Sequence, residues 1–163
     1  MNRKVSSFLL ACLAATSFSA SAAEDGAPPK VFSDLGATMQ SRVCGELMTG
    51  LAMGGVQALK LQAKGKIIPE KQKQAVYDTG AQAVVLLTLS GSLKLEERLK
   101  AGEVTQAIEK MDPTAHINTA MFCKRRVEAW IRAGQVDRDL AKKAYGQAKN
   151  LLDSVFSADD AEQ

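Results

Sequence analysis

The chain has 163 residues, of which 46% are hydrophobic and 24% are charged. This is the composition of one ordinary globular domain, and it excludes a collagen, a disordered polymer and a multidomain enzyme. A single histidine, three cysteines and 5% aromatic residues leave few side chains for catalysis. We therefore expect no enzymatic activity, no catalytic residues, no metal and no cofactor, and no motif defines a biochemical activity.

The first 23 residues have the order of a secretory signal peptide. Arg3 and Lys4 precede the uncharged residues 5–18, and small residues follow up to a cleavage point after Ala22 or Ala23. The uncharged run is too short for a comfortable membrane span. The sequence therefore predicts export to the periplasm without a stable membrane span. An alternative is a lipid anchor on Cys12, because residues 9–12 resemble the lipobox of bacterial lipoproteins.

Removal of the signal peptide changes the charge balance. It lowers the count of basic residues from 21 to 19 against 18 acidic residues, so the formal net charge falls from +3 to about +1. Binding to nucleic acid generally draws on a strong positive field. The balanced charge therefore predicts a protein that does not bind nucleic acid.

Two cysteines, Cys44 and Cys123, remain after cleavage. An even pair in an oxidising compartment predicts a disulfide. A bond between Cys44 and Cys123 closes a loop of 79 residues. In the chain-entropy model a bond that closes such a loop stabilises the folded state by about 4–5 kcal/mol.

Helix-forming residues dominate the exported part, and no segment alternates in the manner of a strand. The predicted fold is all-α, a compact bundle of about five helices with one disulfide. The expected organisation is a signal peptide (1–23), a flexible leader (24–32), a helical domain (33–157) and an acidic disordered tail (158–163).

In chain order, the first helix is expected to begin near Ser33 or Asp34 and to end at Gly65. Its glycines require close packing, for which Gly50 and Gly54 are suitably spaced, or they break the helix near Gly54. The second helix is expected to begin with Pro69 at its first helical position. Its uncharged portion, residues 79–93, predicts a buried central helix that ends at residues 90–92.

Two short helices, 93–101 and 104–111, are expected on either side of Gly102. Asp112 and Pro113 then form a helix-start signal, and this helix is expected to end just before Gly134. A final amphipathic helix is expected over residues 137–156.

His116 and Cys123 are the only candidates for a catalytic pair. They share one helix face, but two turns separate their backbones by roughly 10 Å, too far for a direct hydrogen bond. We expect a buried His116 beside the disulfide. No short spacing of Cys or His indicates a metal site.

Basic residues gather in two segments, either of which is most simply a solvated helix surface. Either segment could instead meet an acidic partner, a lipid headgroup or peptidoglycan-linked anions, and a partner becomes the better interpretation if the two segments adjoin in the fold. The segments comprise Lys60, Lys64, Lys66, Lys71 and Lys73, and then Lys124, Arg125, Arg126 and Arg132. The partner-binding candidates are Lys64, Lys66, Arg125, Arg126, Trp130 and Arg132.

The favoured function is binding to another protein. In outline the chain resembles small disulfide-bearing helical proteins that serve as immunity proteins or inhibitors, secretion accessories or periplasmic chaperones. This likeness rests on the signal peptide, length, helices and cysteine pair. An alternative is a carrier of a lipid or other apolar small molecule in a pocket beside the uncharged helix. A third interpretation, thiol redox or metal handling, requires that Cys44 and Cys123 are free thiols.

Overall fold

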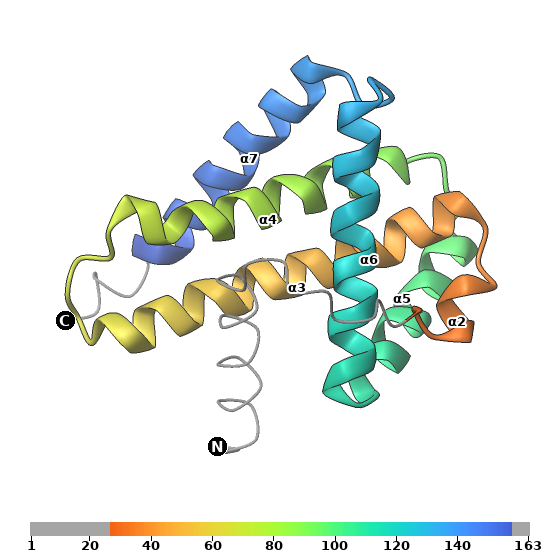
Figure 1. The fold of residues 1–163 in the computed structure, drawn as a ribbon, viewed down its shortest axis with the longest axis horizontal. Coiled ribbons are helices and arrows are strands. Elements are labelled where there is room, and N and C mark those ends of the chain that lie inside the picture. The colour runs from red at the N-terminus through yellow and green to blue at the C-terminus, as the bar shows by residue number, and fades with distance from the viewer. Residues whose placement is uncertain (1–26, 158–163) are drawn as a thin grey trace.

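Two long helices run side by side in opposite directions and form the centre of the fold (Figure 1). The structure is a computed structural model that describes residues 27–157, so the predicted signal peptide and acidic tail lie outside the described residues. Within residues 27–157 all regular structure is helical, as predicted. The helices are α2 (Lys30–Ser33), α3 (Ala37–Ala63), α4 (Glu70–Leu89), α5 (Leu95–Lys110), α6 (Pro113–Arg132) and α7 (Arg138–Ser157).

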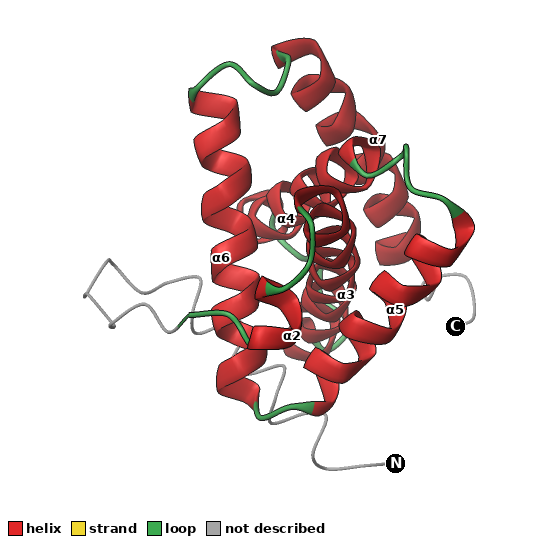
Figure 2. Cartoon of the chain, turned by 90° about the vertical axis from the view of Figure 1, so that its right-hand side faces the viewer, coloured by secondary structure: helices red, strands yellow, loops and turns green. Residues whose placement is uncertain are grey.

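The shorter helices surround the α3–α4 pair. α7 packs along α4, α5 packs on α3, and α6 crosses both long helices (Figure 1). Viewed along the pair, α3 and α4 occupy the middle, with α5, α6 and α7 around them (Figure 2). None of the helices within residues 27–157 is long and apolar enough to cross a membrane.

Glycines let α3 and α4 approach closely. A Cβ atom on Gly45 would lie 2.7 Å from Cδ2 of Leu87, and one on Gly55 would lie 2.9 Å from Cγ2 of Val76. This packing explains why α3 continues through Gly54 without a break. The sequence correctly predicts that glycines of this helix allow close packing. The glycines at which α3 comes closest to α4 are Gly45 and Gly55. A Cβ on Gly50 would only make an ordinary 3.8 Å contact with Glu109.

The buried side chains form two clusters along the α3–α4 pair. The first contains the disulfide and residues of every helix, among them Phe32, Leu47, Leu86, Ile108, Val127 and Ala144. The second lies nearer the α3–α4 turn and contains Ala52, Val56, Leu59, Val76, Tyr77, Ala148, Leu152 and Phe156. α7 contributes to both clusters, and this fixes its position along α4.

The chain before α3 is more ordered than the predicted flexible leader. Residues 30–33 form α2, and Phe32 is completely buried with its ring edge-on to Phe122, 5.5 Å between centroids. Burial of one aromatic ring outweighs the turn-forming composition of this segment. As a result α3 begins later than predicted, with Gly36 as its N-cap instead of Ser33 or Asp34.

A second predicted helix boundary is also wrong, and the two boundaries of α6 are confirmed. Gly102 does not separate two helices, because α5 runs unbroken through it. A glycine in a helix costs only about 1 kcal/mol, and burial of Val104 and Ile108 offsets this cost. Asp112 does cap α6, since its side chain accepts hydrogen bonds from the N–H groups of residues 114 and 115. The left-handed Gly134 (φ 69°) follows its end.

Candidate functional site

The two cysteines form a disulfide that joins α3 to α6. The sulfur atoms of Cys44 and Cys123 are 2.02 Å apart, and both residues are completely buried. His116, on the same face of α6, is 8% exposed. With both sulfurs bonded to each other, neither cysteine offers His116 a thiol to activate. This part of the molecule is a structural core.

Burial lowers the pKa of His116, and Glu109 opposes this effect in part. As the pH falls below about 6.5, the unfolded chain binds a proton that folded His116 does not. The free energy of unfolding therefore decreases with falling pH until the lower folded-state pKa is reached. Because His116 is the only histidine, we expect His116→Gln to flatten the stability curve between pH 7 and pH 5. Urea unfolding at each pH measures this slope, and an unchanged slope would contradict the assignment.

The two basic segments lie apart in the molecule and do not adjoin. Lys64 and Lys66 belong to the α3–α4 turn at one end of the long axis, while α6 crosses the long helices away from that end (Figure 1). Arg125 and Arg132 are exposed on α6, and Nε of Arg132 donates to the carbonyl oxygen of Glu128 in its own helix. The predicted partner-binding residues therefore divide into two separate surfaces.

Arg126 and Trp130 form a fixed pair on the α6 surface. The Arg126 guanidinium lies 4.7 Å from the centroid of the Trp130 ring and also faces Phe122. Its Nη1 donates to Oε1 of Gln40, which comes from α3. Burial lowers the pKa of the guanidinium. The cation remains charged at every physiological pH, but it has already lost part of its water.

Gln40 is a site residue that the sequence analysis missed. Its amide nitrogen donates to the carbonyl oxygens of Phe32 and Ser33, each at 3.4 Å. Gln40 thus ties Arg126 to the end of α2. Gln40 and Arg126 are 86 positions apart in the sequence, so no local spacing could have paired them.

Trp130 also lines an open, shallow depression of about 210 Å³ between α3, α4, α6 and the α6–α7 connection. A second depression, of about 290 Å³, adjoins it across the first turn of α3 and shares Ala37 and Thr38. We call Arg126, Trp130 and the first depression the Trp130 surface. The first depression is lined by Ala37, Thr38, Ser41, Leu89, Trp130, Gln135 and Val136.

The α3–α4 turn forms the second surface. Lys64 has a left-handed backbone (φ 49°) and is followed by the left-handed Gly65 (φ 79°). For a residue other than glycine this conformation costs roughly 1–2 kcal/mol. Lys64, Lys66 and Lys71 are exposed, and Ile67 is 96% exposed. We call these four residues the basic turn.

A polar network beside the basic turn holds α7 on α4. The buried Tyr77 donates its hydroxyl hydrogen to Oδ1 of Asp153. Nζ of Lys149 lies 2.9 Å from Asp153 and 3.0 Å from Glu70. Burial and the bond to Asp153 raise the pKa of Tyr77 to about 12. Tyr77 therefore stays protonated at neutral pH and serves as a structural donor.

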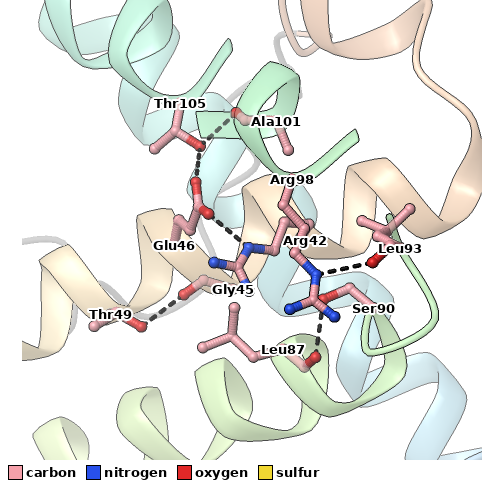
Figure 3. A network of polar contacts seen from close by, with 10 residues as sticks. All are labelled: Arg42, Gly45, Glu46, Thr49, Leu87, Ser90, Leu93, Arg98, Ala101 and Thr105. Carbon is pink, nitrogen blue, oxygen red and sulfur yellow. Dashed lines mark hydrogen bonds and ion pairs between the residues drawn. The ribbon is translucent and has the colours of Figure 1, made fainter. Parts of the chain in front are cut away.

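A second network fixes the other end of α3 (Figure 3). Glu46 lies between Arg42 (2.6 Å) and Thr105 (2.7 Å), which links α3 to α5. Arg98 donates to the carbonyl oxygens of Gly91 and Leu93 and closes the α4–α5 connection. The bond from Thr105 to Glu46 joins α5 to α3, and Arg98 binds the α4–α5 connection, so this network has a structural role.

Within residues 27–157, no three side chains of His, Cys, Asp or Glu lie close enough together to hold a metal ion. The chain matches no protein-family model, no curated protein and no solved structure. The Trp130 surface and the basic turn are therefore the candidate binding sites of the described residues.

Proposed function

We propose that this chain acts in the periplasm by binding another protein, and that the Trp130 surface is the contact. The observation that carries the proposal is the fixed Arg126–Trp130 pair beside the first depression. Tryptophan and arginine are the side chains that most often dominate binding energy at protein interfaces. A surface of this kind suits an inhibitor, an immunity protein, a secretion accessory or a chaperone.

The contacts of Arg126 make the pair suitable for binding. The hydrogen bond to Gln40 and the stacking on Trp130 already hold the guanidinium in place. Side chains that are fixed before association lose less conformational freedom when the partner binds. The adjoining depression includes Leu89, which is 38% exposed and supplies an apolar wall. A protruding apolar or acidic side chain of the partner fits this combination.

The carrier alternative gains less support from the geometry. Its pocket was expected beside the uncharged part of α4, but Ala83, Val85 and Leu86 are at most 3% exposed and belong to the first buried cluster. The depression beside Trp130 is shallow and open, whereas carrier pockets enclose most of the ligand. The geometry therefore favours protein binding.

The test is capture from a periplasmic extract on the immobilised chain, followed by measurement with the purified captured protein. We expect Trp130→Ala and Arg126→Ala each to weaken binding by at least about 30-fold, the loss typical of a dominant interface residue. Lys143→Ala, at an exposed position on α7, is the matched control and should bind as the unmodified chain does. Thermal unfolding confirms that each variant is folded.

If the captured protein binds both Trp130→Ala and Arg126→Ala with unchanged affinity, the Trp130 surface is not the contact. Equal losses in these variants and in Lys143→Ala would also overturn the proposal, because they would indicate nonspecific adsorption.

A further inference from the structure

The basic turn combines positive charge with an exposed apolar side chain at one tip of the molecule. Lys64, Lys66 and Lys71 have no ion-pair partner among residues 27–157. The neighbouring carboxylates, Glu70 and Asp153, share Lys149, so these two carboxylates and one ammonium together carry one negative charge against the three positive charges of Lys64, Lys66 and Lys71. The turn therefore keeps an excess of positive charge in the described part of the fold.

Ile67 gives this tip its apolar character. It is 96% exposed, whereas the next residue, Ile68, packs against the second buried cluster. Leu61, in the last turn of α3, is also 67% exposed. Since Ile68 anchors the turn, Ile67 projects from a held backbone, with the three lysines around it in the sequence.

We propose that the basic turn docks on an anionic lipid surface, with Ile67 entering the headgroup layer and Lys64, Lys66 and Lys71 contacting lipid phosphates. Lysines beside exposed apolar side chains are the composition of peripheral membrane-binding segments. The turn lies at the end of the long axis (Figure 1), where a flat surface can meet it without contacting α6. This surface is separate from the Trp130 surface and gives a protein-binding domain a reversible membrane contact.

Shape and charge favour a lipid surface over an acidic protein. A nearly fully exposed isoleucine at a tip can insert into the boundary of the acyl chains without a matching pocket. An anionic headgroup layer also offers a phosphate to each of the three lysines, whatever the distances between their ammonium groups. An acidic protein would need a matching apolar pocket for Ile67.

Sedimentation of the chain with vesicles tests the proposal. We expect binding to phosphatidylglycerol vesicles at low ionic strength, weaker binding as salt increases, and little binding to phosphatidylcholine vesicles. Lys64→Gln/Lys66→Gln should lower the partition coefficient about 25-fold, from about fivefold for each lysine. Ile67→Ser should lower it several-fold at every salt concentration. All of these side chains are exposed, so the variants should keep the melting temperature of the unmodified chain.

Lys142→Gln/Lys143→Gln is the matched control, because it changes the net charge equally at two exposed positions of α7 away from the turn. It should bind phosphatidylglycerol vesicles as the unmodified chain does, and so should Trp130→Ala. The proposal is wrong if the chain does not bind these vesicles, or if the control and turn variants lose binding equally. Binding to poly-L-glutamate but not to vesicles would instead identify an acidic protein as the partner of the turn.

Discussion

Replacement of both Cys44 and Cys123 with alanine is expected to lower the free energy of unfolding by about 4–5 kcal/mol. The disulfide closes a loop of 79 residues, and without it the unfolded chain regains the entropy that the bond removes. For a domain of this size the melting temperature should fall by more than about 10 °C. Calorimetry of the unmodified chain and the double variant, with and without reductant, measures the effect.

Reductant provides the control for this prediction. It should lower the melting temperature of the unmodified chain toward that of the double variant and leave the double variant unchanged. The assigned role of the disulfide would be contradicted if the double variant melted at the temperature of the oxidised unmodified chain.

Gly45→Ala is expected to destabilise the fold by about 1–3 kcal/mol, although alanine is the better helix former. The added Cβ would lie 2.7 Å from the Leu87 side chain and 3.2 Å from its backbone nitrogen. Leu87 can change rotamer, but its backbone cannot move without shifting α4. Chemical denaturation of the variant measures this cost.

Gly146→Ala is the matched control, because no atom other than those of its chain neighbours and its own helix backbone lies within 4 Å of the added Cβ in α7. It should stabilise the protein by up to about 1 kcal/mol through helix propensity alone. If the two variants changed stability in the same direction, the close approach of α3 and α4 at Gly45 would not be limiting.

Local signals predicted the fold well where one or two residues decide the outcome. The Asp112 cap and Gly134 set the ends of α6, and the cysteine pair predicted the disulfide. The predicted secondary structure was wrong where a contact between residues far apart in the sequence determines the local structure. Packing against α3 carries α5 through Gly102, and the contact with Phe122 orders Phe32.

The candidate site was predictable only in part. The sequence indicated Arg126 and Trp130 as separate partner-binding candidates. It did not predict their contact, although a spacing of four residues allows two side chains to meet on one helix face. Gln40 could not be found, because its bond to Arg126 depends on how α3 meets α6. For the same reason the sequence could not show that Lys64 and Lys66 lie far from Arg125 and Arg132.

The division of the buried side chains into two clusters has a consequence for local opening of the fold. The disulfide belongs to the first cluster, and no cross-link constrains the second, where Tyr77 and Phe156 meet. Proteins open locally in contiguous cooperative units. The end of the molecule that contains the second cluster can therefore open locally while the disulfide-linked part beneath Trp130 keeps its shape.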